Sequence, residues 1–240
     1  MVRQSTGRKR DATRTKASIL NAAITEFATR GPAGTRVDEV ASRAGVNKSL
    51  IYQYFGSKQE LYAEALNSVL EAITAKSAEY SRSFGNAQSV GDLRTLIRGY
   101  LENHLRLMEA VPEWPRLLSW ENLEGGRTLS RLPVQQTYKV FLDRVSNILK
   151  PLAHRGLLAE NFDLRLVAQA VMALTHFFVI QKGTIQHLFQ MEPNAPETRE
   201  TWLNYCADLF VAAFKNGPME LANPDERSTK QVKPDDQKFQ

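Results

Sequence analysis

The side chains best suited to bind a polyanion lie close together in the first quarter of the chain. They are Asn47, Lys48, Ser49, Tyr52 and Gln53, which are polar or amphipathic at positions not expected to pack. A lysine reaches phosphates or guanine acceptors, a glutamine amide pairs with adenine, and a tyrosine contacts a phosphate or a thymine methyl group. These residue types at this spacing indicate contacts to double-stranded DNA.

Two short helices joined by a tight turn are expected to position these side chains. Gly45 supplies the positive φ that a three-residue turn between helices requires, and Ala41 is small enough for the helices to cross closely. The helices pack through apolar residues: Val37, Val40, Ala41, Leu50, Ile51 and Tyr54. This helix-turn-helix pattern suits the major groove, although an ordinary helical hairpin has the same spacing.

Helix start and stop signals divide the chain into helices nearly throughout. The first helix begins near Asp11 or Thr13 and ends at Gly31-Pro32, and Asn47 can cap the third. Thr35-x-x-Asp38 opens the second helix and Ser57-x-x-Glu60 opens a long fourth one. Apolar spacing predicts further helices at residues 89–110, 113–124, 130–155, 163–190 and 196–215.

The predicted fold class is all-α, with a three-helix DNA-binding domain followed by a helical ligand-binding and dimerisation domain. The expected division is a disordered basic arm at residues 1–10, the helix-turn-helix domain at 11–56, the regulatory domain at 57–216 and a disordered tail at 217–240. The tail is polar and contains proline, so it buries too little apolar surface to offset the entropy of ordering.

Charge and composition exclude several classes of protein. Residues 1–60 hold eleven Lys and Arg against five Asp and Glu, whereas residues 61–240 hold twenty against twenty-one. A basic first quarter suits a polyanion, because neutralised phosphates release counterions. The longest apolar stretch, Val167 to Ile180, is shorter than the roughly 20 residues of a membrane span, and the N-terminus lacks a secretory apolar region. The single cysteine, Cys206, forms no internal disulfide, which fits a cytoplasmic protein.

A longer pattern resembles the tetracycline-repressor (TetR) family of transcriptional regulators, without a gap over residues 14–62. It reads Phe27-Ala28-x-x-Gly31, Thr35-x-Val37-x-x-Val40-Ala41, Ala44-Gly45-Val46, and Ile51-Tyr52-x-Tyr54-Phe55-x-Ser57-Lys58-x-x-Leu61. The rest of the chain resembles that family in length and helix arrangement only. Asn47 and Leu50 depart from the usual residues, so no operator sequence carries over.

The resemblance implies roles for individual residues. Thr35 and Arg36, at the start of the second helix, are expected to meet phosphates with help from its free N–H groups. Lys48 and Ser49 are expected at base edges. Three further residues complete the predicted DNA contacts: Tyr52 and Tyr54 at the backbone and thymine methyl groups, and Lys58 at a phosphate.

The regulatory half contains all three Trp and all four His residues. An aromatic-walled cavity with a few polar groups is the usual small-molecule site, and the alternative is that these side chains are ordinary core. The residues expected to line a ligand pocket are Tyr100, His104, Met108, Trp114, Trp120, Tyr138, Phe141, Met172 and His176.

Excess apolar surface on the last two helices predicts a two-fold, four-helix dimer interface. Its expected residues are Val167, Val171, Leu174, Phe178, Trp202, Tyr205, Leu209 and Phe210. Such a dimer would place two recognition helices about one DNA turn apart on a palindromic operator.

The sequence therefore predicts a homodimeric repressor that a small-molecule effector releases from operator DNA, with no metal, cofactor or membrane partner. A corepressor-dependent or activating regulator of the same fold, and a helical protein-interaction module, are the alternatives. An enzyme is not expected, because the chain lacks a glycine-rich phosphate loop, a G-x-S-x-G elbow, an H-E-x-x-H motif and zinc spacing.

Overall fold

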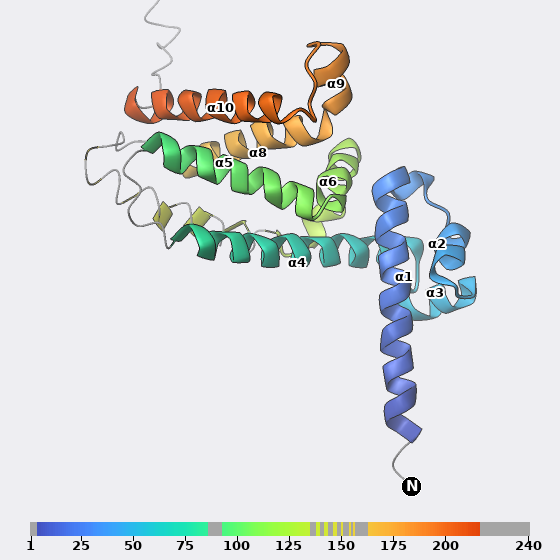
Figure 1. The fold of residues 1–240 in the computed structure, drawn as a ribbon. Helices are drawn as coiled ribbons and strands as arrows, with labels where there is room; N and C mark the ends of the chain where they lie inside the picture. Colours follow the sequence, from blue (N-terminus) through green and yellow to red (C-terminus); the bar gives the residue numbers. More distant parts are fainter. Residues whose placement is uncertain are drawn as a thin grey trace, which may run out of the picture.

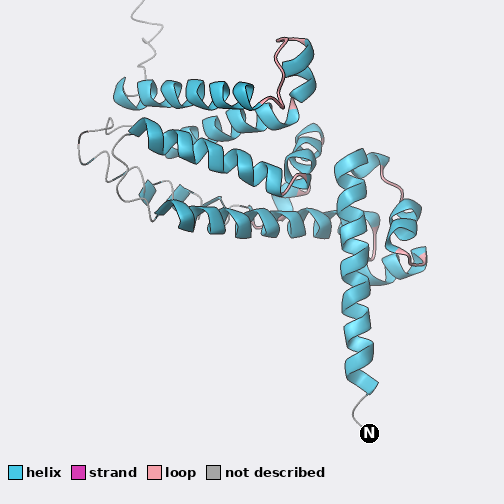
Figure 2. Cartoon of the chain, in the orientation of Figure 1, coloured by secondary structure: helices cyan, strands magenta, loops and turns pink. Residues whose placement is uncertain are grey.

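In a computed structural model of the chain, the described backbone covers residues 4–85, 93–134 and 163–216, with scattered residues between 138 and 156. Side chains are described over 11–80 and from residue 93 onward within these ranges, except at 164 and 216. All the regular secondary structure in these residues is helical, and no strand is present among them (Figure 2). The all-α fold class predicted from the sequence is confirmed.

The first helix is longer at its start than the sequence predicted. Helix α1 spans Gln4–Gly34, so residues 4–10 are helical and the expected disordered arm is wrong for them; residues 1–3 lie outside the described part. The predicted break at Gly31-Pro32 is confirmed, because Gly31 leaves the helical conformation with φ 71°. The chain turns there toward the next helix.

Helices α2 (Val37–Ala44) and α3 (Lys48–Phe55) form the predicted helix-turn-helix unit. Gly45 has φ 67°, and its N–H points to the carbonyls of Ala41 and Ser42, which ends α2. Asn47 caps α3 by accepting a hydrogen bond from the Ser49 N–H at 3.0 Å. Both features were predicted from the sequence.

A second group of helices lies beside this module (Figure 1). Helix α4 (Lys58–Gly85) begins at the predicted Ser57 cap, whose Oγ accepts from the Glu60 N–H at 3.1 Å, and it runs away from α1. Helices α5 (Leu93–Ala110) and α6 (Glu113–Leu123) follow, and then the short 3-10 helix η1 (Leu129–Arg131). Helix α6 packs against both α1 and α4.

The last helices form an outer layer in which α10 lies against α5, and α5 against α8 (Figure 1). They are α8 (Leu164–Ile180), α9 (Lys182–His187) and α10 (Pro196–Asn216). The single helix predicted over 163–190 is wrong, because Gln181 departs from helical geometry with ψ 33° and the chain changes direction into α9. Much of the predicted helix 130–155 and the whole tail 217–240 lie outside the described residues.

Two hydrophobic cores hold the described helices together. The first core joins α1–α4 to the end of α5 and to α6, and Phe27, Val40, Ile51, Leu61 and Leu117 are nearly inaccessible within it. The second core joins α5, α8, α9 and α10 through residues such as Leu101, Val171 and Leu203. The predicted boundary at residue 56 cuts through the first core, because α4 packs against α1. No described helix has both the length and the apolar character required to cross a membrane.

Candidate nucleic-acid interface

Helix α3 packs through one face and exposes the other. Ile51 and Phe55 are buried in the first core, whereas Ser49, Tyr52 and Gln53 are exposed, with 42% of the Tyr52 surface accessible. A side chain at i and another at i+4 lie on one helix face, so Ser49 and Gln53 share the exposed side. A short helix with a polar outer face and an apolar inner face fits the major groove.

Lys48 lies at the start of α3, where its ammonium group is paired with Asp38 of α2. The Nζ atom is 3.0 Å from the Asp38 carboxylate, and both side chains are about half exposed. An exposed ion pair contributes only about 0–1 kcal/mol, so a phosphate or a guanine can replace Asp38 at little cost. The predicted role of Lys48 is compatible with this pairing.

Thr35 does not offer its hydroxyl group to DNA. Its side chain is 2% exposed, and Oγ1 donates to the Gly31 carbonyl at 2.8 Å. The N-cap of α2 is Arg36, which makes no side-chain capping bond, so the predicted Thr35 cap and phosphate contact are corrected. Burial follows from the turn at Gly31, which folds Thr35 back onto α1. Arg36 stays exposed at the N-terminus of α2.

Three other predicted DNA residues have structural partners. The Asn47 side chain accepts the Ser49 N–H and thereby positions the start of α3. Tyr54 is half-buried beside Phe55, with ring centroids 6.4 Å apart, which favours the packing alternative for its ring. The Lys58 ammonium group donates to the Ala33 carbonyl at 3.3 Å. Ala33 precedes Arg36, the N-cap of α2, by three residues.

The role of Glu26, which holds α2 against α1, was not predicted from the sequence. This carboxylate is 5% exposed, and it accepts from Arg43 Nε at 2.7 Å and lies 3.5 Å from Arg30 Nε. Arg30 also pairs with Glu39 of α2. A buried carboxylate needs such partners, because an unpaired buried charge costs several kcal/mol, about 3–5. The sequence signal was a glutamate on the buried face of α1, one residue before Phe27.

Comparison with known proteins matches both halves of the chain. The model "Bacterial regulatory proteins, tetR family" matches residues 19–65, and "Tetracyclin repressor-like, C-terminal domain" matches residues 91–210, which is half of the chain. The chain belongs to the TetR family. It is a DNA-binding transcriptional regulator, and the resemblance seen in its first quarter is confirmed.

Individual TetR-family relatives match over different lengths. The HTH-type transcriptional repressor SCO4008 of Streptomyces coelicolor is 42% identical over 49% of this chain, and the match spans about half, 54%, of that protein. The repressor NicS of Pseudomonas putida is 24% identical over 87% of this chain and 96% of that protein. The structure of FadR from Bacillus subtilis in complex with stearoyl-CoA has a TM-score of 0.55 at 18% identity, covering 82% and 98% of the two chains. That likeness shows the fold.

In this TetR-family chain, α6 connects the regulatory helices directly to the DNA-binding module. The Trp120 ring covers Gly31, where a Cβ atom would lie 2.7 Å from it, and Nε1 donates to the Ala28 carbonyl at 3.4 Å. Glu121, fully buried, accepts from the N–H groups of Thr128 and Leu129 at 3.0 Å each. Burial, with Glu121 close by, raises the pKa of Tyr62 on α4. Trp120 was predicted to line a pocket, and the structure places it at this junction instead.

The residues predicted to line a ligand pocket divide between different parts of the molecule. Met108 and Trp114 pack with the first core, whereas Tyr100 packs against the second. Tyr138 is 38% exposed, and Phe141 lies outside the described residues. One pocket lined by all nine residues is therefore not present among the described residues.

His104, Thr175 and His176 do come together, between α5 and α8. The Thr175 hydroxyl donates to the Val171 carbonyl at 2.6 Å, so His104 Nδ1–H donates to Thr175 Oγ1 at 2.8 Å. Burial, with His176 nearby, lowers the pKa of His104 to about 4, which keeps the ring neutral at pH 7. The His176 Nε2 atom is buried without a hydrogen-bond partner. Met172, another predicted pocket residue, lies one turn before His176 on α8.

Several predicted dimer residues are buried within one chain. Val171, Phe178 and Phe210 are 3–7% exposed in the second core, because α8 and α10 both pack on α5. Their assignment to the interface is corrected. Val167, Leu174 and Trp202 are partly buried against that core, whereas Tyr205 and Leu209 are 58% and 45% exposed.

Two requirements of reactive sites bear on the described residues, a cluster of metal-ligating side chains and a deprotonated thiol. No group of three or more His, Cys, Asp or Glu residues could hold a metal ion there. Burial raises the pKa of the Cys206 thiol to about 11, so this thiol is protonated at neutral pH and is a poor nucleophile. The relatives reported above are transcriptional regulators.

Proposed function

We propose that the chain acts as a homodimeric repressor that reads a palindromic operator with α3 and leaves it when a small molecule binds. The observation that carries the proposal is the contrast between the two faces of α3. Ile51 and Phe55 anchor the helix, and Ser49, Tyr52 and Gln53 project from it without packing. The named relatives SCO4008 and NicS are repressors, which favours repression over activation.

The direct test is binding to DNA from upstream of the gene that encodes the chain, measured by fluorescence anisotropy at two salt concentrations. Gln53→Ala removes an expected base contact of about 1–3 kcal/mol, so affinity falls roughly 5- to 150-fold. Gln59→Ala, an exposed glutamine on α4, is the matched control and leaves affinity unchanged. Absence of a salt-sensitive specific complex, on that DNA and on genomic fragments, would contradict the proposal.

Outward-facing apolar side chains on α8 and α10 support the dimer. Leu166 and Phe177 on α8 are 64% and 39% exposed, and Tyr205 and Leu209 on α10 are 58% and 45% exposed. Spacings of 11 and 4 residues place each pair on one face of its helix. A two-fold contact would cover both faces at once, and it would hold two α3 helices about one DNA turn, roughly 34 Å, apart.

Sedimentation of the purified chain tests the dimer separately from DNA binding. Leu209→Glu places a charge in the proposed contact, so the dimer dissociation constant rises at least about 100-fold if the burial of one charge costs roughly 3 kcal/mol. Leu123→Glu, at an exposed leucine on α6, should leave the mass unchanged. A wild-type chain that stays monomeric at micromolar concentration would overturn this part of the proposal.

Release from DNA is proposed to pass through α6. Its Trp120 touches α1 at Ala28 and Gly31, so a ligand that displaces α6 also displaces the module that holds α3. Linkage requires that DNA and ligand weaken each other equally, typically by about 1–3 kcal/mol. A ligand that tightened the DNA complex would instead identify a corepressor.

A further inference from the structure

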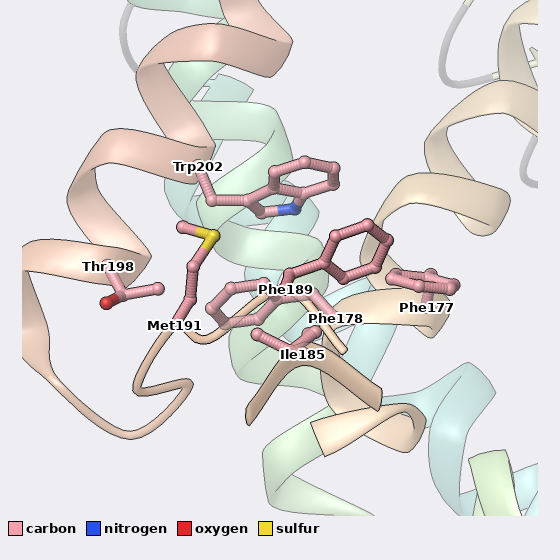
Figure 3. Close-up of a pocket in the computed structure, with 7 residues that line it drawn as sticks. All are labelled: Phe177, Phe178, Ile185, Phe189, Met191, Thr198 and Trp202. Carbon is pink, nitrogen blue, oxygen red and sulfur yellow. The ribbon is translucent and has the colours of Figure 1, made fainter. Parts of the chain in front are cut away.

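A pocket opens between α8, α9 and the start of α10, and none of its lining residues was predicted to bind a ligand (Figure 3). Its volume is about 210 Å³. The lining comes from three segments of the chain: Phe177, Phe178, Ile185, Phe189, Met191, Thr198 and Trp202.

The walls of the pocket are aromatic and carry no accessible polar surface. The Phe178 and Trp202 rings are nearly parallel, with centroids 6.0 Å apart and an interplanar angle of 12°. Thr198 is the one hydroxyl residue in the lining, and Figure 3 shows its methyl group toward the pocket and its oxygen away from it. Apart from the Trp202 indole nitrogen, drawn in blue in Figure 3, a ligand therefore meets carbon and sulfur.

The segment after α9 holds two of the walls in place. Gln190 has φ 53°, a conformation that costs a residue other than glycine about 1 kcal/mol or more and persists only where neighbouring contacts enforce it. Here the Phe189 and Met191 N–H groups donate to the carbonyls of Thr184 and Ile185 at 3.3 and 3.2 Å. The Lys182 ammonium donates to Asn194 Oδ1 at 2.8 Å across the same loop. Gln190, the strained residue, therefore lies between Phe189 and Met191, two of the residues that line the pocket.

We propose that this pocket binds a neutral single-ring aromatic molecule. An apolar cavity of about 150 Å³ is enough for benzene, so the volume here accommodates one substituted ring. A carboxylate or ammonium group would lose its hydration without gaining a charged partner, because no lining residue carries a charge, and this cost disfavours charged analogues. Parallel aromatic walls favour an aromatic ligand over an alkyl chain of equal volume, because offset-stacked and edge-to-face ring contacts add to burial.

The pocket also adjoins the proposed dimer contact. Phe177 lines the pocket and lies on the exposed face of α8 with Leu166, and Trp202 lies one turn before Tyr205 on α10. The centroids of the Trp202 indole ring and the Tyr205 phenol ring are 6.3 Å apart. A ligand in the pocket would therefore alter the packing of side chains behind the proposed dimer contact. Only this link between the pocket and release from DNA rests on the proposed function.

Calorimetric titration of the full chain with toluene tests the site without DNA. One toluene per chain is expected to bind, with a negative heat-capacity change from apolar burial. Benzoate and benzylamine, of similar size but charged, are expected to bind at least tenfold more weakly. Failure of toluene to bind up to its solubility limit, or equal binding of the charged analogues, would overturn the proposal.

A matched pair of threonine substitutions locates the binding. Thr198→Phe fills the pocket and is expected to weaken toluene binding at least tenfold, whereas Thr25→Phe, at an exposed position on α1, leaves it unchanged. Equal affinity in both variants would place the ligand elsewhere and overturn the proposal. If Thr198→Phe does not fold, as judged by circular dichroism, Ile185→Ala replaces it: the enlarged pocket should shift preference at least fivefold from toluene toward naphthalene.

The outcomes separate the pocket from the repressor proposal. Toluene binding without any change in DNA affinity would support the site and remove its link to release. Toluene binding that appears only in monomeric Leu209→Glu protein would show that a second copy occupies the pocket, and it would overturn the ligand proposal. The comparison with Leu209→Glu protein needs no DNA, so it does not depend on whether the operator has been identified.

Discussion

The two cores of this protein differ in how completely a single chain closes them. Among the described side chains of α1–α6, two large hydrophobic residues are exposed: Tyr52 on the outer face of α3 and Leu123 at the end of α6. On α8, α9, α10 and the loop after α9 there are seven, among them Leu166, Phe177, Phe189 and Leu209. The first core is finished by its own helices, whereas the second leaves apolar surface at α8, the α9 loop and α10.

This difference separates two uses of apolar surface. The first core must hold α3 in one orientation, so it buries aromatic and aliphatic side chains tightly around Phe27 and Tyr62, whose rings meet edge-on with centroids 4.9 Å apart. The second core retains surface and a pocket for other molecules, in keeping with the proposed dimer and ligand. Exposed apolar patches on a folded domain commonly mark such contacts.

The largest expected effect comes from deleting one phenylalanine in each region. Phe27→Ala removes a fully buried ring, and urea denaturation should show a loss of about 3–5 kcal/mol in the free energy of unfolding. Phe177→Ala, at a ring that is 39% exposed, should cost about 1 kcal/mol or less. Similar losses of unfolding free energy in the two variants would contradict the proposed difference between the two cores.

The junction between the regions should be sensitive at Gly31 and tolerant at Gly34. Gly31→Ala forces a side chain into φ 71° and within 2.7 Å of the Trp120 ring, so unfolding free energy should fall by about 2–3 kcal/mol. Gly34→Ala places a Cβ at 3.5 Å from Arg30 Cβ, an ordinary contact, and should change stability by less than about 0.5 kcal/mol. Thermal melting of both variants measures the difference, and a tolerant Gly31 would mean that α6 does not constrain α1.

Acid should weaken the second core through His104. Its folded pKa of about 4 lies below the ordinary histidine value of 6.5, so the unfolded chain takes up the proton first. Stability is therefore complete above pH 6.5 and declines by about 1–3 kcal/mol as the pH falls toward 4. His104→Gln should flatten that part of the pH profile in urea titrations, whereas His187→Gln, an exposed histidine on α9, should preserve it.

The smallest expected effect concerns the Lys48–Asp38 pair, which joins α3 to α2 in the region of the first core. Asp38→Asn frees the lysine and removes a negative charge beside the DNA face, so affinity for operator DNA should rise roughly two- to fivefold at low salt. Stability should change by less than about 1 kcal/mol, because the pair is exposed. Anisotropy at two salt concentrations measures the gain, with Glu71→Gln on α4 as the control; a loss of affinity would show that Asp38 positions Lys48 for binding.

The first core was largely predictable because its signals are local. Apolar spacing placed Val37, Val40, Ala41 and Ile51 on packing faces, and capping chemistry placed Gly45, Asn47 and Ser57. Each depends on residues within one or two helical turns. The family resemblance over the same stretch was confirmed by comparison.

The regulatory residues were harder to assign because apolar periodicity does not distinguish a core from a pocket or an interface. The same helical stripe that predicted a dimer contact at Val171, Phe178 and Phe210 packs inside the chain. Phe189 and Met191, which line the observed pocket, lie in a loop where no periodic signal exists. Trp120 was grouped with pocket residues, and its contact with Gly31 joins positions 89 residues apart in the sequence.

The sequence by itself determined that the chain is helical, that its first quarter contains a helix-turn-helix, and that Gly45, Asn47 and Ser57 lie at helix ends. These outcomes depend on hydrogen bonds and side-chain spacing between near neighbours. Only the tertiary structure decided that Thr35 is buried, that Glu26 joins α1 to α2, and that a pocket opens between α8 and α10. Those features arise where helices meet, because the side chains that form them come from distant parts of the chain.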